Sequence, residues 1–287
     1  MPRRWFPDGV AGQAYFCVVG SPIAHSKSPL IHAAFATQLG LSLRYERIEV
    51  AAGELAAALA EFRAYGGRGM NVTVPLKEEA WQLAATRTAR AEQAGAANTL
   101  WFTPAGTVAA DNTDGAGLVR DLVDNHGVAL AGRQILLLGA GGAARGVVPA
   151  LLDAAPAGLA VSNRTAARAE ALCAAFATRA ALEVIPWGAL PARAPDVVIN
   201  ATTLSMRGEV PPLPATLPGA GTVYYDMMYG NEPTAFVRWA RAHGALRALD
   251  GLGMLVEQAA EAFLCWHGVR PDSAPVIAAL RHPQDGA

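Results

Sequence analysis

The sequence predicts an α/β fold with mostly parallel sheets. Short apolar runs alternate with helix-length segments, and one of these runs leads directly into a glycine-rich turn that opens a small-residue helix. With 287 residues and a hydrophobic content of 52%, the chain is long enough for about two domains, each with its own core. We therefore expect two consecutive α/β domains.

The first domain is expected to alternate strands with helices from Tyr15 onward. Its strand-like runs occupy residues 15–19, 43–50, 69–74 and 98–102. Ser28 can cap the first helix, with Pro29 as its first residue and Gly40 as a stop signal. Residues 21–28 are thereby placed in a loop between a strand and a helix.

The second α/β unit begins near Arg133, with a strand at residues 134–138. We expect a connecting helix over 114–126, a proline-rich surface loop at 211–218, and an apolar helix over 252–267 that returns to the first domain. The resulting domain assignment is residues 1–114, completed by C-terminal helices in 251–287, and residues 115–250.

The charge balance favours a small-molecule partner. Lys and Arg total 23 against 24 Asp and Glu, and a net charge of -1 gives no broad attraction to nucleic acid or an anionic membrane. No apolar run approaches the roughly 20 residues that span a bilayer, and the N-terminal basic residues precede no apolar signal segment. We expect a cytoplasmic protein, and the sequence leaves open whether it is a monomer or a homodimer.

The three cysteines, Cys17, Cys173 and Cys265, are odd in number and widely spaced. This spacing indicates neither a disulfide framework nor a zinc site. We expect three reduced, buried thiols and no bound metal.

The glycine-rich turn indicates a dinucleotide-binding site. Residues 139–145 read GAGGAAR, a G-x-G-x-x-A pattern between an apolar strand and a helix. Gly139 permits the tight turn, Gly141 lets the backbone approach a pyrophosphate, and Ala144 allows close packing of the helix. The pattern predicts a Rossmann-like domain whose cofactor contacts include Gly139, Ala140, Gly141, Gly142 and Ala143. A plain glycine turn is the structural alternative.

The residues after the next strand favour NADP over NAD. This strand, at residues 159–162, is followed by a polar set without an acid: Asn163, Arg164, Thr165 and Arg168. An acid here normally binds the ribose 2'-hydroxyl of NAD, whereas arginine can pair with the 2'-phosphate of NADP. Alternatively, the two arginines are solvated charges at a helix start.

Polar clusters in the first domain predict a substrate site. They lie at or near strand ends, at residues 26–28, 71–77, 98–99 and 111–115. Ligands bind at that edge of open parallel sheets, and these hydroxyl, amide, ammonium and carboxylate groups suit a hydroxylated acidic substrate. Lys77 and Asp114 can form an acid/base pair, because a carboxylate beside an ammonium holds it in place and tunes its proton transfer.

The chain resembles the shikimate dehydrogenases over nearly its whole length, from about Tyr15 to Pro275. The matching segments follow the family's order: 20–29 (GSPIAHSKSP), 71–77 (NVTVPLK), 98–100 (NTL), 111–115 (DNTDG), 139–145 (GAGGAAR), 163–165 (NRT) and 250–255 (DGLGML). The resemblance implies reversible reduction of 3-dehydroshikimate to shikimate by NADPH, on the chorismate route to aromatic amino acids.

The resemblance also implies roles for individual residues. Ser26 and Ser28 match positions that bind the substrate carboxylate, and Lys77 matches the acid/base residue. Further substrate contacts fall on Thr73, Asn98, Asp114, Tyr229 and Gln258, with Asn98 and Asp114 at ring hydroxyls. Met227 and Gly251 match positions at the nicotinamide end of the NADP site.

Structural roles compete with some of these assignments. Lys77 alone could be a solvated surface lysine, and Tyr229 and Gln258 could be helix-packing residues. We expect Asn71 and Asn112 to satisfy loop backbone groups rather than to bind substrate.

The chain departs from the family pattern in one loop. Residues 200–206 read NATTLSM, with Ser205 where relatives carry glycine before the methionine, and the role of this altered loop toward the cofactor is left open. Ala89 stands where many relatives have an acid, and we assign no role there. His25 is a loop histidine, and we favour a structural role for it over proton donation.

Two other functions remain open. A quinate/shikimate dehydrogenase that prefers NAD is disfavoured by Arg164 and Arg168, and by Ser28 where a threonine would suit quinate. A catalytically silent paralogue that senses NADP(H) or a metabolite is disfavoured because both Lys77 and Asp114 are present.

Overall fold

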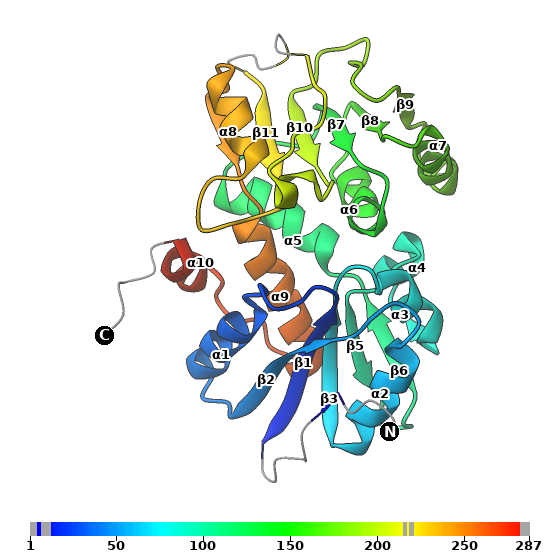
Figure 1. The fold of residues 1–287 in the computed structure, drawn as a ribbon, viewed down its shortest axis with the longest axis vertical. Helices are drawn as coiled ribbons and strands as arrows, with labels where there is room; N and C mark the ends of the chain where they lie inside the picture. The colour runs from blue at the N-terminus through cyan, green and yellow to red at the C-terminus, as the bar shows by residue number, and fades with distance from the viewer. Residues whose placement is uncertain (1–4, 7–12, 215–216, 218–220, 282–287) are drawn as a thin grey trace. The chain divides into compact units, whose positions relative to one another are not determined.

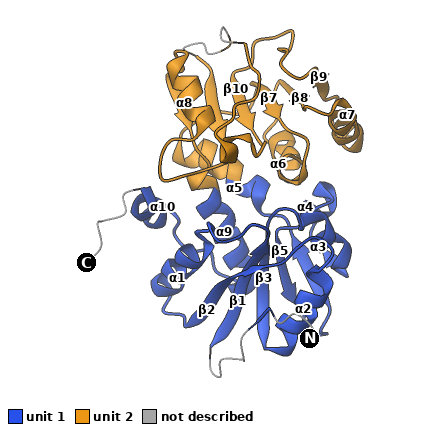
Figure 2. Ribbon diagram, in the orientation of Figure 1, with its two compact units in different colours: residues 1–117, 255–287 blue, residues 118–254 orange. Residues whose placement is uncertain are grey.

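The computed structural model describes residues 5–6, 13–214, 217 and 221–281. Its contacts divide the chain into two compact units, shown in different colours in Figure 2. Unit 1 comprises residues 1–117 and 255–287, and unit 2 comprises residues 118–254. The chain passes from one unit to the other within helix α5 (Asp114–Arg120) and again within helix α9 (Leu252–His267).

Unit 1 is built on a six-stranded sheet of order β2-β1-β3-β5-β6-β4 (Figure 1). Its strands are β1 (Ala14–Gly20), β2 (Leu43–Glu49), β3 (Gly67–Val72), β4 (Thr86–Arg87), β5 (Thr99–Phe102) and β6 (Val108–Asp111). Besides most of α9, its helices are α1 (Ser28–Gln38), α2 (Leu55–Ala64), α3 (Lys77–Leu83), α4 (Ala89–Ala94) and α10 (Ala274–Arg281).

The sheet of unit 1 is parallel except around β5. The pairs β1-β2, β1-β3 and β4-β6 are parallel, whereas β5 runs antiparallel to both β3 and β6. Residues 103–107 close a tight turn in which the Thr103 amide donates to the Thr107 carbonyl over 2.9 Å. So short a link joins only antiparallel strands. The predicted α/β fold with mostly parallel sheets is confirmed, with this hairpin as an unforeseen exception.

Unit 2 is a wholly parallel six-stranded sheet of order β12-β11-β10-β7-β8-β9. Its strands are β7 (Gln134–Leu138), β8 (Gly158–Ser162), β9 (Glu183–Ile185), β10 (Val197–Asn200), β11 (Val223–Asp226) and β12 (Arg247–Leu249). Its helices are α6 (Gly142–Asp153), α7 (Ala166–Ala175) and α8 (Ala235–Ala242), with a π-helix at Asp121–Asn125 and a 3-10 helix at Leu204–Arg207. This is the doubly wound dinucleotide-binding order, in which the chain direction across the sheet reverses between β7 and β10.

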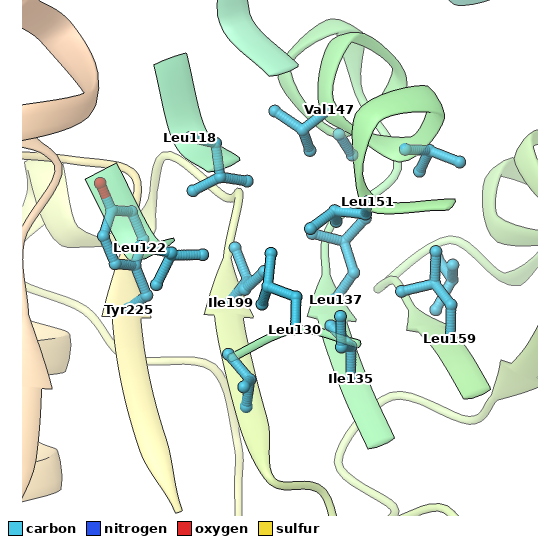
Figure 3. Packing of buried hydrophobic residues seen from close by; sticks show 14 of the residues in the cluster. Leu118, Leu122, Leu130, Ile135, Leu137, Val147, Leu151, Leu159, Ile199 and Tyr225 are labelled. Carbon is cyan, nitrogen blue, oxygen red and sulfur yellow. The ribbon is translucent and has the colours of Figure 1, made fainter. Parts of the chain in front are cut away.

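The core of unit 2 explains why β7 is a continuous apolar run. Ile135 and Leu137 pack in one buried cluster with Val147 and Leu151 of α6, as Figure 3 shows. Leu136 and Leu138 belong to a second cluster on the opposite face of the strand. A strand that is covered on both faces carries apolar side chains at every position rather than at alternate ones.

The structure corrects several local expectations. Ser28 is the first residue of α1 and makes no capping hydrogen bond, because Lys27 occupies the N-cap position with a helical backbone (φ -88°, ψ -1°). Strand β3 ends at Val72, so Thr73 lies beyond it. Cys17 and Cys173 are buried as predicted, but Cys265 is only partly buried.

Other predicted elements are confirmed. Strand 134–138 and helix 252–267 have the expected bounds, and the predicted helix over 114–126 is present over 114–125 as α5 and the π-helix that continues it, with His126 as its C-cap. In the proline-rich segment, residues 211–214 and 217 lie outside helices and strands, while 215–216 and 218 are outside the described residues, as are 1–4 and 7–9. Among the described helices, none is both long and apolar enough to cross a membrane.

Candidate functional site

The polar clusters of unit 1 meet at one edge of its sheet. The chain leaves β1, β3 and β6 and enters the reversed strand β5 at this edge. The strand register aligns these points, since Val19 pairs with Val72 and Thr99 pairs with both Asn71 and Asp111. The structure therefore brings together side chains that are far apart in the sequence.

Lys77 and Asp114 form a close ion pair at this edge. The Lys77 Nζ lies 2.5 Å from Asp114 Oδ2, with the side chains only 11% and 8% exposed. Lys77 is the first residue of α3, and its carbonyl accepts a hydrogen bond from the Ala97 amide over 2.8 Å. Asp114 is the first residue of α5, and its amide donates to Asn112 Oδ1 over 3.2 Å. The pair presents a proton-carrying ammonium held by a carboxylate, which suits general acid/base chemistry.

Asn98 holds the Asp114 carboxylate from the other side. Its Nδ2 lies 2.9 Å from Asp114 Oδ1, 2.9 Å from Thr113 Oγ1 and 3.2 Å from Gln258 Oε1. An amide nitrogen has two protons, so the longest contact, to Gln258, is the weakest of the three. The Asn98 Oδ1 accepts the Thr113 amide over 2.9 Å, which fixes the start of α5.

Ser26 and Ser28 form a buried pair of hydroxyls. The Ser26 Oγ donates to Ser28 Oγ over 3.1 Å, and the two residues are 8% and 5% exposed. Thr73 directly follows β3, and its amide donates to the Val19 carbonyl over 2.9 Å. A Cβ on Gly20 would come 2.4 Å from the Thr73 Cγ2, so only glycine fits there.

Other polar residues of these clusters behave as structural groups. Asn112 Nδ2 donates to the Ala96 carbonyl over 2.9 Å, and Asn71 Nδ2 donates to the Asn98 carbonyl over 3.2 Å. His25 is exposed. The structure also reveals a residue that the sequence analysis missed, because Tyr45 of β2 donates its hydroxyl to Asn71 Oδ1 over 2.7 Å. No motif contains Tyr45, so only the parallel pairing of β2 with β1 could have drawn attention to it.

In unit 2, the glycine turn lies at the point where the strand order reverses. Gly139 has φ +111°, and a Cβ there would approach the Ala201 backbone to 3.2 Å, so a side chain would be strained. A Cβ on Gly141 would face open space, and α6 begins at Gly142. The turn thus leaves room for a ligand phosphate in front of free helix N–H groups.

The arginines predicted to recognise NADP follow the neighbouring strand. Leu138 pairs with Ser162, so the residues after β8 emerge beside the glycine turn. Arg164 and Arg168 are exposed, and Asn163 Nδ2 donates to the Thr165 carbonyl over 2.9 Å. Two exposed guanidinium groups, which can pair with a phosphate, thus follow the strand next to the glycine turn.

The loop after β10 is tied to a buried carboxylate. Ser205 and Thr234 each donate a hydroxyl to Asp226 Oδ2 over 2.6 Å, and Asn200 Nδ2 donates to Asp226 Oδ1 over 3.0 Å. Burial raises the pKa of Asp226, and these donors partly offset the rise. The sequence had left the role of Ser205 open, and its partner is now identified.

Met227 and Gly251 are also brought together. A Cβ on Gly251 would lie 2.4 Å from the Met227 carbonyl oxygen, so only glycine allows this approach. The Gly251 amide donates to the Met228 carbonyl over 3.0 Å. Tyr229 follows two residues after Met227 and is partly buried.

Comparison with known proteins identifies related sequences across both units. Residues 18–100 match the shikimate dehydrogenase substrate binding domain, residues 121–206 match the shikimate / quinate 5-dehydrogenase family, and residues 251–281 match the shikimate 5'-dehydrogenase C-terminal domain. The shikimate dehydrogenase (NADP(+)) of Alkalilimnicola ehrlichii is 57% identical over 93% of this chain and 98% of its own length.

Solved structures of related enzymes have a similar fold over nearly the whole chain. Shikimate 5-dehydrogenase of Thermus thermophilus, in complex with NADP(H) and shikimate, has a TM-score of 0.84 and 36% identity, covering 94% of this chain and 99% of its own. The ligand-free 5-ketofructose reductase of a Gluconobacter strain has a TM-score of 0.82 and 29% identity, covering 94% and 99%. On its sequence and its fold, the chain belongs to the shikimate dehydrogenase family.

Proposed function

We propose that the protein catalyses the reversible, NADPH-dependent reduction of 3-dehydroshikimate to shikimate. The observation that carries this proposal is the Lys77–Asp114 pair at the ligand edge of the unit 1 sheet, in a chain whose other unit has an NADP-type nucleotide turn. The high identity to enzymes named shikimate dehydrogenase (NADP(+)) supports the same substrate and cofactor.

Lys77 is the proton donor in this proposal. Bound NADPH supplies the hydride. As the substrate carbonyl becomes an alkoxide, Lys77 Nζ gives its proton to that oxygen, and in the reverse direction the amine takes the hydroxyl proton back. Asp114, 2.5 Å from Nζ, keeps the ammonium oriented and balances its charge. The remaining Asp114 oxygen accepts from Asn98, which holds the carboxylate in place.

The substrate is held by neutral donors and by the ion pair. Ser26 and Ser28 bind the carboxylate, because paired buried hydroxyls can donate to an anion. The other substrate residues in this proposal are Thr73, Lys77, Asn98, Asp114, Tyr229 and Gln258.

The cofactor site belongs to unit 2. The pyrophosphate of NADPH would be held at the start of α6 by Gly139, Ala140, Gly141, Gly142 and Ala143. Asn163, Arg164, Thr165 and Arg168 would hold the 2'-phosphate, and Met227 and Gly251 would line the nicotinamide end. Because residues 159–168 contain no acid, NADP is preferred over NAD.

Because the fold is also similar to that of a 5-ketofructose reductase, the choice of substrate is the part of the proposal that most needs a test. The decisive assay follows nicotinamide absorbance with shikimate or quinate, each with NADP+ or NAD+. Reduction with shikimate and NADP+ alone supports the proposal. Equal rates with quinate or NAD+ would assign a dual-specificity enzyme, and no reaction in any combination would favour a ligand-sensing protein. A cytoplasmic location forms part of the proposal, since the reaction joins soluble metabolites.

A further inference from the structure

Tyr45 is a polar residue beside the candidate substrate site that no recognised motif contains. It lies on β2, and its hydroxyl donates to Asn71 Oδ1 over 2.7 Å. Its ring stacks on His32, with centroids 4.3 Å apart and an interplanar angle of 8°. Burial lowers the pKa of His32 to about 3, so this ring is neutral near pH 7 and packs as an aromatic surface. The Tyr45 ring is therefore held in one orientation.

From Asn71 the hydrogen bonds continue to the catalytic pair. Asn71 Nδ2 donates to Thr99 Oγ1 over 3.2 Å, and Thr99 Oγ1 donates to Asn98 Oδ1 over 2.9 Å. Asn98 Nδ2 donates to Asp114 Oδ1 over 2.9 Å, and Asp114 Oδ2 accepts from Lys77. An unbroken chain of side-chain hydrogen bonds thus joins the Asn71 amide to the ion pair.

The four bonds from Tyr45 to Asp114 run in the same direction, and Lys77 donates to Asp114 from the other side. Every hydroxyl and amide of the chain accepts from the preceding group and donates to the next one, an arrangement in which the bonds strengthen one another. Asn71, Thr99 and Asn98 are 6%, 0% and 3% exposed, so water cannot readily replace a lost partner. The donor at the start of the chain therefore influences which way the Asn98 amide is turned.

Tyr45 also contacts the serine pair of the candidate substrate site, through Ser28. Burial raises the pKa of the Tyr45 hydroxyl well above its ordinary value, and a hydrogen bond from Ser28 offsets part of that rise. Ser28 in turn accepts from Ser26 over 3.1 Å. The Tyr45 hydroxyl is thus the junction between the serine pair and the chain that ends at Asp114.

We propose that Tyr45 is a positioning residue for the Lys77–Asp114 pair, acting through Asn71, Thr99 and Asn98. The proposal rests on the proposed function, because its readout is the turnover that Lys77 supports. Tyr45 does not touch the reacting atoms. Together with the Thr113 amide, which donates to Asn98 Oδ1 over 2.9 Å, it orients the Asn98 amide so that a proton, not a lone pair, faces Asp114, and it thereby helps to fix the carboxylate that holds the Lys77 ammonium.

Tyr45→Phe removes the hydroxyl and keeps the stacked ring. We expect kcat with shikimate and NADP+ to fall about tenfold, with a smaller change in KM for shikimate, because a group that orients the acid/base pair acts mainly on the chemical step. The matched control is Tyr15→Phe, which removes a buried tyrosine hydroxyl from the adjacent strand, where it donates to Glu46 Oε2 over 2.5 Å. Tyr15→Phe should lose stability without losing kcat.

A double-mutant cycle separates positioning from general damage. In a Lys77→Ala background, Tyr45→Phe should cause no further loss of kcat, because the group that it positions is absent. A full further loss in that background, or equal kcat values for Tyr45→Phe and Tyr15→Phe, would overturn the proposal.

The proposed function is checked first with the wild-type protein. An inactive wild type would contradict that function and not the hydrogen-bond chain. The series of hydrogen bonds is then tested by measuring the free energy of unfolding in urea for Tyr45→Phe, Asp114→Asn and the double variant. If the two substitutions are energetically coupled, the hydrogen-bond connection between Tyr45 and Asp114 is supported. Strictly additive losses of stability would overturn the proposal.

Discussion

The Ser205 hydroxyl donates to the buried Asp226 carboxylate over 2.6 Å, and this contact ties the loop after β10 to the end of β11. The Asp226 carboxylate is fully buried and also accepts from Thr234 and Asn200. Met227, the next residue, lies in the proposed cofactor site. A residue that departs from the family pattern therefore links the loop after β10 to the segment that carries Met227.

We predict that Ser205→Ala and Ser205→Gly both weaken cofactor binding. Loss of a hydrogen bond to a buried charged group costs about 1.5–3 kcal/mol. KM for NADP+ should rise several-fold, with little change in KM for shikimate, because the loop is no longer fixed on Asp226. The glycine variant also adds backbone freedom, so it should bind NADP+ more weakly than the alanine variant does. Unchanged KM for NADP+ in both variants would show that this contact does not serve the cofactor site.

Arg164 provides the test of cofactor choice. It is exposed at the end of β8, next to the strand that leads into the glycine turn. We expect Arg164→Ala to raise KM for NADP+ about tenfold, as for loss of one charge-assisted hydrogen bond, and to leave KM for NAD+ nearly unchanged. The exposed Arg193 offers a matched control, since it lies outside the proposed site. Equal losses with both cofactors would remove 2'-phosphate recognition from Arg164.

Asp111 should make stability depend on pH in the acid range. Burial alone would raise the pKa of Asp111, but hydrogen bonds and charge attraction from Arg90 outweigh this, and the pKa lies below the ordinary 3.8. The stability contributed by this carboxylate is therefore fully present above pH 3.8 and is lost as the pH falls through the lower folded-state pKa.

Asp111→Asn should lower the free energy of unfolding at pH 7 by about 1–3 kcal/mol, a range reduced because Arg90 is 42% exposed. The difference from the wild type should shrink below pH 3.8. Urea unfolding of both proteins at several pH values measures this difference in the free energy of unfolding. Asp153→Asn, which removes the partner of a surface arginine, is the control and should change little. A difference that stays constant into the acid range would contradict the assigned ion pair.

Local sequence patterns predicted the elements in which one feature dominates. Strand 134–138 is an apolar run that ends at glycine, and helix 252–267 is apolar along its length, so both bounds are correct. The prediction that Ser28 caps α1 was wrong, because the Ser28 hydroxyl pairs with Ser26 instead of with the helix backbone. A capping motif does not reveal which partner a hydroxyl will choose.

The Lys77–Asp114 pair was predicted because both residues lie in motifs, but contacts between distant residues that no motif contains could not be predicted. Arg90 lies between Asp111 and Glu261 and pairs with both, although Arg90 and Glu261 are 171 residues apart. Tyr45 was missed for the same reason, since its partner Asn71 lies two strands away in the sheet. Only the strand order and register place these side chains together.

The measurement that tests the central claim most directly compares kcat of the wild type and Lys77→Ala, with saturating shikimate and NADP+. The proposed role predicts clear turnover by the wild type and a loss of about a hundred- to ten-thousand-fold in the variant, the usual contribution of a positioned acid/base group. Near-equal kcat values for two folded proteins would contradict the assignment of Lys77 as the group that exchanges the proton.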